Sequence, residues 1–424
     1  MDDPSNQNYR QCHYHGSPPI ANTSPAAIAD LNRLLREQLQ VQPSSTLSST
    51  AATTTIESAP TPSPNQAAVA AVTAILAAET AAASVALGNL YQGLLGIYQR
   101  IELEPSLRTR QYVSRHGLVL SPDQCVTTQT DTHRISRFIR GIDQALIQLQ
   151  QQPRERPLNV VYPACGPFAP LLLPLLCFYQ NRSGADPINI KVTLIDIQPG
   201  AVASLQAVTH ELGLGKYIES IVCMDGCDYR SEQPIDLLII EAMQHGFSRE
   251  AHLPLAQGLV PQMSDHGVLI PERIELSAQL VVGQHEYIER WQKSKGNEQP
   301  LPAERIKLGT VLTLTKESVT QLCVRQLRDN STLIDCNTVL IPEIPPQLGE
   351  QLLVICTQIY TFKMECLDEY QSGITHPLPD TQVCINFIPS DPKPGDLLLR
   401  NGDCIKFYYR LNGLPGFLAT QGGR

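Results

Sequence analysis

The stretch Leu158-Asn-Val-Val-Tyr-Pro-Ala-Cys-Gly166 decides the fold of this chain. Its apolar run at 160–162 is typical of a strand, the small residues Ala164 and Gly166 predict a tight turn, and a helix-like run begins near Pro170. In such a unit the backbone can approach a ligand closely, and the helix start directs N–H groups at negative charge. The stretch therefore indicates a ligand site at Ala164 and Gly166, with a plain turn glycine as the alternative.

The segments that follow repeat this unit. Short runs rich in Val, Ile and Leu at 192–197, 218–224 and 235–241 are separated by helix-length segments, and a further helix at 249–263 precedes a strand at 267–270. Strands that alternate with helices predict a parallel sheet covered by helices on both faces. We therefore expect a Rossmann-like domain over residues 157–273, with its site at the carboxyl ends of the strands.

The C-terminal part has a different pattern. Strand-like runs occur at 274–282, 310–314, 319–327, 332–341, 352–362, 382–388 and 403–411, with Gly and Pro between them. Few helical patterns separate these runs, apart from an excursion at 286–295. Residues 274–424 are therefore predicted to form an antiparallel sheet or barrel.

The N-terminal part divides into a tail and a helical region. Residues 1–66 are low in large apolar side chains and are expected to be disordered, with one short helix at 31–39. Residues 67–156 are expected to be helical. The Ala-rich run 67–98 contains Glu79 and several glycines, which favours packed helices over a membrane span; their apolar face would lie against the next domain or a second subunit of a homodimer. In the helix at 131–149, Arg137 and Arg140 are interpreted as a solvated basic face.

Composition narrows the function classes. The 424 residues carry a net charge of −9, which argues against general binding to nucleic acid or to an anionic membrane. The 12 cysteines lack CxxC pairs, and no signal-peptide pattern is visible, so we expect reduced thiols and a cytoplasmic protein. The cluster Cys12-His-Tyr-His15 has metal-ligating residue types but is interpreted as incidental, and no metal site is expected.

Two carboxylates follow predicted strands on the same sheet edge. Asp196 is placed to accept hydrogen bonds from both hydroxyls of a ribose, and Asp225 to accept one from an adenine amino group; either could instead cap a helix. The chain lacks both G-x-G-x-x-G and G-x-x-x-x-G-K-[ST], which disfavours dinucleotides and nucleoside triphosphates. An adenosine ligand without phosphates suggests S-adenosyl-L-methionine as the cofactor.

Several motifs then combine into a family resemblance. Glu241 and Glu250 lie nine positions apart around a loop, Gly267-Val-Leu-Ile-Pro-Glu-Arg273 follows, and Asp131-Thr-His-Arg134 lies upstream. With Thr375-His376 near the end, this order resembles the class I S-adenosylmethionine-dependent methyltransferases, and more narrowly the protein arginine methyltransferases. The resemblance implies an α/β fold: a Rossmann-like methyltransferase domain followed by an antiparallel β-barrel-like domain, with a helical N-terminal region.

The resemblance also implies roles for individual residues. Arg134 would hold the cofactor carboxylate, Glu241 and Glu250 would orient a cationic acceptor, and His376 would contact the substrate. Independently of the family, His245 lies between the two glutamates and could act as a general base.

The chain departs from the family pattern at two places, one that bears on the geometry of the cofactor turn and one that bears on the substrate. Tyr162 replaces the acidic residue of the glycine-rich turn, and Pro377 stands where the family has tryptophan. We therefore expect N-methylation of a guanidino or amino group on a small molecule or a peptide. O-methylation of a small metabolite and a non-catalytic binding protein that keeps the fold are the alternatives.

Overall fold

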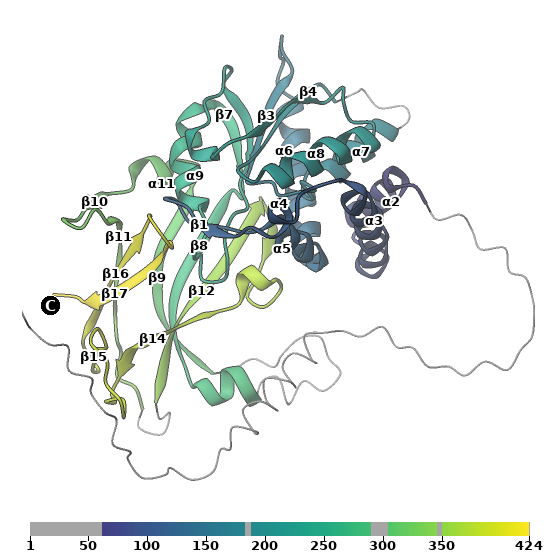
Figure 1. Cartoon of the computed structure of the whole chain (residues 1–424). Coiled ribbons are helices and arrows are strands. Elements are labelled where there is room, and N and C mark those ends of the chain that lie inside the picture. The colour runs from purple at the N-terminus through teal and green to yellow at the C-terminus, as the bar shows by residue number, and fades with distance from the viewer. Residues whose placement is uncertain (1–61, 183–187, 290–303, 346–349, 424) are drawn as a thin grey trace, which may run out of the picture. The chain divides into compact units, whose positions relative to one another are not determined.

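The computed structural model describes residues 62–182, 188–289, 304–345 and 350–423 (Figure 1). The expectations of a disordered tail and of a short helix at 31–39 concern residues that lie outside this part, except for 62–66. The same holds for the part of the 286–295 excursion beyond residue 289. Within the described residues, no helix is both long enough and apolar enough to cross a membrane.

The Rossmann-like core is a five-stranded parallel sheet, as the sequence predicts. Its strands are β3 (Leu158–Pro163), β4 (Ile190–Asp196), β5 (Ile218–Cys223), β6 (Ile235–Ile239) and β7 (Met263–Ile270). The spatial order is β5-β4-β3-β6-β7, with every neighbouring pair parallel. The connections reverse direction between β3 and β6, and a crevice at the carboxyl ends of two such strands is the usual ligand position in open α/β sheets.

Helices pack on this sheet, and two further helices from the N-terminal region pack on them (Figure 1). They are α2 (Pro64–Leu76), α3 (Thr80–Arg100), α6 (Thr132–Gln150), α7 (Leu173–Asn181), α8 (Pro199–Glu211) and α9 (His252–Leu259). Helix α2 packs on α3 and α7, and α3 packs on α8. The helix expected at 249–263 is shorter than predicted, because Pro261 lies in a 3-10 turn after α9 and β7 already begins at Met263.

The expectation of a solvated face on α6 is wrong for Arg137 and Arg140. Arg137 donates a hydrogen bond from Nη1 to Oε2 of Glu365 at 2.9 Å. Arg140 donates from Nε to the carbonyl oxygen of Ile75 at 2.8 Å. The two guanidinium groups therefore tie α6 to the antiparallel domain and to α2, two partners that are remote in sequence.

The C-terminal domain is largely antiparallel, as expected. One sheet contains six strands, β8 (Arg273–Val281), β9 (Arg305–Thr315), β12 (Gln351–Phe362), β13 (Glu365–Leu367), β14 (Leu378–Ile385) and β15 (Leu397–Leu399). The other contains β10 (Val324–Gln326), β11 (Thr332–Leu340), β16 (Cys404–Arg410) and β17 (Gly416–Gln421). Among the described strands of these two sheets, only the pair β14–β15 is parallel. The two sheets approach each other along β9 and β11.

The strand expected at 319–327 is wrong over its first half. Residues Lys316–Gln321 form a short helix, α11, and only Val324–Gln326 pair as a strand. Thr315 explains the difference, because its hydroxyl accepts a hydrogen bond from the Ser318 amide at 3.1 Å while Ser318 bonds back to the Thr315 amide. This capping box starts a helix in spite of the strand-like composition.

Gly141 in α6 and Gly88 in α3 can be compared to test how closely α6 packs on β12. A Cβ at Gly141 would lie 2.6 Å from Oγ1 and 2.8 Å from Cβ of Thr361, whereas a Cβ at Gly88 in α3 meets nothing within 4 Å. In chemical denaturation, Gly88→Ala should raise the free energy of unfolding by up to about 1 kcal/mol, through helix propensity alone. Gly141→Ala should lower it by about 1–3 kcal/mol, because the overpacked methyl group displaces β12. Equal effects of the two substitutions would contradict this packing.

Candidate active site

The backbone of the turn after β3 has a conformation that would let a ligand approach it closely. Ala164 (φ 49°) and Gly166 (φ 65°) both lie in the left-handed region. The Gly166 amide donates a hydrogen bond to Oδ2 of Asp196 at 2.9 Å, and the Gln198 amide donates to Oδ1 of Asp196 at 2.8 Å. Burial raises the pKa of Asp196 to about 6. A carboxylate has about four lone-pair sites, so two remain for hydroxyl groups after these backbone bonds.

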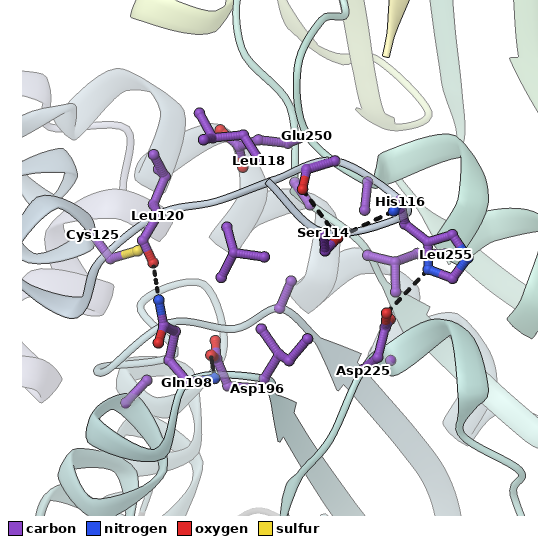
Figure 2. Close-up of a pocket in the computed structure, with 18 of the residues that line it drawn as sticks. Ser114, His116, Leu118, Leu120, Cys125, Asp196, Gln198, Asp225, Glu250 and Leu255 are labelled. Carbon is purple, nitrogen blue, oxygen red and sulfur yellow. Dashed lines mark hydrogen bonds and ion pairs between the residues drawn. The ribbon is translucent and has the colours of Figure 1, made fainter. Parts of the chain in front are cut away.

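A hairpin from the N-terminal region covers this edge of the sheet. Strands β1 (Tyr112–Val113) and β2 (Leu118–Val119) pair antiparallel between the short helices α4 (Pro105–Thr109) and α5 (Pro122–Thr127). Beneath the hairpin lies a cavity of about 90 Å³, here called the sheet-edge cavity (Figure 2). Its lining includes Ala164, Asp196, Gln198, Asp225, Ala242 and Glu250.

Backbone contacts hold this hairpin in place. The Leu118 amide donates a hydrogen bond to the carbonyl oxygen of Arg249 at 2.7 Å. A Cβ at Gly117 (φ 152°) would lie 2.9 Å from that same carbonyl oxygen, so the close approach needs glycine. The Gln198 side chain also donates to the Leu120 carbonyl oxygen at 2.9 Å (Figure 2).

Asp225, at the turn after β5, meets the tip of the hairpin. Nδ1 of His116 lies 3.1 Å from Oδ2 of Asp225 (Figure 2). The Cys227 amide donates a hydrogen bond to Oδ1 of Asp225 at 3.0 Å. The hydrogen bond with His116, more than any other contact, lowers the pKa of Asp225 to about 2. Asp225 therefore lines the cavity as expected, but its carboxylate already has a partner from the chain. Its role toward adenine stays a prediction.

Arg134 is buried at the start of α6 and faces the end of β6. It donates from Nη1 to Oε2 of Glu241 at 2.9 Å and from Nη2 to the carbonyl oxygen of Thr128 at 2.8 Å. Its Nε finds no hydrogen-bond partner among the described residues, and Oδ2 of Asp131 is 3.9 Å away. A buried donor left unpaired destabilises the fold by about 1–3 kcal/mol, so the position favours an added carboxylate.

The loop from Glu241 to Glu250 folds back on itself. Gln244 and Ser248 form an antiparallel bridge around Gly246 (φ 64°). Burial, followed by repulsion from Glu241, raises the pKa of Glu250 to about 7. Burial also raises the pKa of Glu241, against the opposing effect of Arg134. The two carboxylates are thus close enough to repel each other, and only Glu241 has a guanidinium hydrogen bond.

Of the two histidines singled out in the sequence, His245 lies within this loop, and His376 follows the 3-10 turn at Gly373–Thr375. Burial lowers the pKa of both His245 and His376, and His245 contributes to the shift of His376. Asp131 holds the segment before His376, because its Oδ2 accepts hydrogen bonds from the Ser372 hydroxyl at 2.6 Å and the Gly373 amide at 3.2 Å. The histidines therefore approach each other but lie outside the lining of the sheet-edge cavity.

Sequence reasoning missed the hairpin. Its signal was present, since the turn Ser114-Arg-His-Gly117 is flanked by the apolar pairs 112–113 and 118–119. The contacts of the hairpin tip could not be predicted from a local sequence pattern, because its partners Asp225 and Arg249 lie more than 100 residues downstream. Asp131 was read only as part of a motif, and its second contact with Ser372 also depends on the tertiary fold.

Comparisons with known proteins add low-identity structural likenesses. No family model and no curated protein matches the chain. Among solved structures, the PRMT1 enzyme–prozyme heterotetrameric complex of Trypanosoma brucei with AdoHcy is similar at 12% identity and a TM-score of 0.38, over 70% of this chain and 92% of that one. Protein arginine methyltransferase 10 of Arabidopsis thaliana, in an open conformation, is similar at 12% identity and a TM-score of 0.40, over 67% and 86% of the two chains.

The raised pKa of Glu250 predicts how stability depends on pH. The folded chain binds the Glu250 proton more tightly than the unfolded chain does, so the free energy of unfolding falls as pH rises from about 4.5 to about 7. Glu250→Gln has no titrating carboxyl group at this position, so its free energy of unfolding should not fall for this reason. Between pH 5 and pH 8, the stability of Glu250→Gln relative to the parent should increase by about 1–3 kcal/mol in urea unfolding.

The exposed side chain of Glu232, in the loop before β6, is the control for this experiment. Glu232→Gln should change the dependence of stability on pH less than Glu250→Gln does. A constant difference for Glu250→Gln would show that Glu250 is charged in the folded protein at pH 5.

Proposed function

We propose that this protein is an S-adenosyl-L-methionine-dependent methyltransferase that methylates a guanidino or amino nitrogen of a small molecule or peptide. One arrangement supports the proposal: Glu241 accepts a hydrogen bond from the buried Arg134, whose Nε has no partner among the described residues. The charge of Glu241, after burial, contributes to the raised pKa of Glu250, so a cationic acceptor would have two carboxylates and the cofactor carboxylate would have a guanidinium donor.

The residues of the sheet edge fit such a cofactor. Asp196 keeps lone pairs that would accept the ribose hydroxyls, and Arg134 Nε would donate to the amino-acid carboxylate. The left-handed turn at Ala164 and Gly166 leaves backbone next to the cavity. Asp225 would take the adenine amino group once His116 moves aside.

The acceptor side depends on charge. When bound, the cofactor supplies an electrophilic methyl group, so the protein's task is to orient the attacking nitrogen. Glu241 and Glu250 would bind a guanidinium or ammonium group between them. The added positive charge would oppose both burial and the repulsion from Glu241, which together raise the pKa of Glu250. His245, with its pKa lowered by burial, is neutral near pH 7 and can accept a proton, while His376 would contact the acceptor.

A binding protein without catalysis is the second candidate, and two observations favour it. The sheet-edge cavity is only about 90 Å³, with the hairpin packed across it, and Arg134 already pairs with Glu241. In the proposed enzyme the hairpin has to move when the cofactor enters. Assembly as a homodimer and a cytoplasmic location stay predictions.

Cofactor binding tests the first half of the proposal. In titration calorimetry with S-adenosyl-L-methionine, Asp196→Ala should weaken binding by about 1–3 kcal/mol, because a charged hydrogen-bond acceptor for the ribose is lost. Asp265→Ala, which removes an exposed carboxylate at the opposite end of β7, should bind like the parent. Absence of binding to the parent chain would exclude the cofactor, and equal affinity of Asp196→Ala would exclude the ribose contact.

Turnover tests the second half. Glu241→Gln and Glu250→Gln should each reduce methyl transfer by at least about a hundredfold, roughly 2.7 kcal/mol of transition-state stabilisation. The double variant should be little worse than the poorer single variant, since the two carboxylates act on one group. An acceptor screen across amines, guanidines, carboxylic acids and phenols provides the assay. Normal turnover by Glu250→Gln with an inactive Glu241→Gln would replace the paired arrangement with a single-base mechanism through His245.

A further inference from the structure

The tip of the hairpin and the turn after β5 bring together three metal-ligating side chains of different chemistry. The donor atoms of His116, Asp225 and Cys227 all lie within 4.8 Å of one another. Nδ1 of His116 and Oδ2 of Asp225 are 3.1 Å apart. In a tetrahedral zinc site, bond lengths of about 2.0–2.3 Å place neighbouring donor atoms about 3.3–3.8 Å apart. The three atoms therefore need only small shifts to surround one ion.

The backbone around these residues is held in place without a ligand. The Cys227 amide donates to Oδ1 of Asp225 at 3.0 Å, which leaves Oδ2 directed at His116. Between them, Gly226 has no room for a side chain, since a Cβ there would lie 2.8 Å from Cδ2 of Leu255. The His116 amide donates to the Ser114 hydroxyl at 3.1 Å, which fixes the hairpin tip (Figure 2).

We propose that His116, Asp225 and Cys227 form a binding site for a zinc-like divalent cation, with a fourth position open to solvent. One nitrogen, one oxygen and one sulfur donor are all ligand types that Zn²⁺ accepts, and three protein ligands with one open position make an open zinc site. When the ion binds, the Cys227 thiol releases its proton to solvent as the metal–sulfur bond forms.

The cation would join two parts of the chain that are otherwise linked by a few polar contacts. His116 belongs to the hairpin, while Asp225 and Cys227 belong to the Rossmann-like core. The bound ion would therefore fix the hairpin across the sheet-edge cavity. The metal site can be tested without the proposed methyl transfer, because its ligands would bind the ion in the absence of any cofactor or acceptor. The ion and the proposed cofactor would compete, since both would use Asp225 and the ion would hold His116 in place.

Cobalt titration tests the site directly. The parent for this experiment is the full chain carrying Cys12→Ser, His13→Ala and His15→Ala, so that the N-terminal cluster does not contribute ligands. Under reducing, oxygen-free conditions, Co²⁺ should bind one to one and give a sulfur-to-cobalt charge-transfer band, which Zn²⁺ should abolish by displacement. Zn²⁺ should also raise the melting temperature, since it binds the folded form.

Three single variants test whether Co²⁺ binds at His116, Asp225 and Cys227 or at another cysteine of the chain. Cys227→Ser should lose the charge-transfer band, and both Cys227→Ser and His116→Ala should bind Co²⁺ at least about a hundredfold more weakly, which exceeds the usual effect of losing an outer-shell partner. Cys223→Ser is the matched control, because Cys223 is exposed at the end of β5 only two residues before Asp225, and it should behave like the parent.

The proposal is overturned if Co²⁺ does not bind the parent one to one, or if the band survives in Cys227→Ser. Unfolding of Cys227→Ser would leave His116→Ala to decide, since that variant keeps every thiol and changes only the hairpin tip. Parent-like affinity of His116→Ala would equally exclude the site. Because no methyl donor is present, none of these results bears on the proposed transfer reaction.

Discussion

The buried ion pair between Arg134 and Glu241 is the contact on which the rest of the site depends. Removing two charges from water is costly, and a buried pair is stable only when further hydrogen bonds satisfy it. Here the Thr128 carbonyl oxygen takes a second donor of the guanidinium group, and Asp131 accepts from the Arg134 amide at 3.1 Å. The pair joins the first turn of α6 to the carboxyl end of β6.

Helix α6, which contains Arg134, also contacts the antiparallel domain and the N-terminal helices. Arg137 reaches β13 and Arg140 reaches the end of α2, on the same helix that buries Arg134. Because Gly141 has no side chain, Thr361 of β12 can lie in contact with the backbone of the helix. Asp131, at the start of the helix, holds the segment that leads to His376. One helix thus aligns the Rossmann-like sheet, the N-terminal helices and the antiparallel domain around one edge.

Carboxyl groups are concentrated at that edge in surroundings that disfavour their charged form. Burial raises the pKa of Asp196, Glu241 and Glu250 together, whereas only Glu241 has a guanidinium partner within hydrogen-bond distance. Buried carboxyl groups with raised pKa values are typical of sites that bind a cationic or hydroxyl-rich ligand. The hairpin across the cavity would then control access, since its contacts are mainly backbone hydrogen bonds and the polar contacts at its tip.

The sequence by itself determined the order of strands and helices in the Rossmann-like core, and it placed Asp196, Asp225 and Glu241 at strand ends. These are local properties: hydrophobic runs of strand length, prolines at helix starts and carboxylates that follow directly after a strand. For the same reason, it identified the turn at Ala164 and Gly166. It also predicted that Glu250 would return toward Glu241, provided that the loop folds back.

Only the tertiary structure decided which distant groups meet. Arg137 and Arg140 look like a solvated face along the helix, because their partners lie in other elements. Thr315 turns a strand-like run into a helix through two short hydrogen bonds that composition does not reveal. His116 comes to Asp225 across 109 positions of sequence, and Cys227 joins them only because the hairpin folds over the sheet edge. Contacts of this kind depend on the packing of whole elements, which local periodicity does not encode.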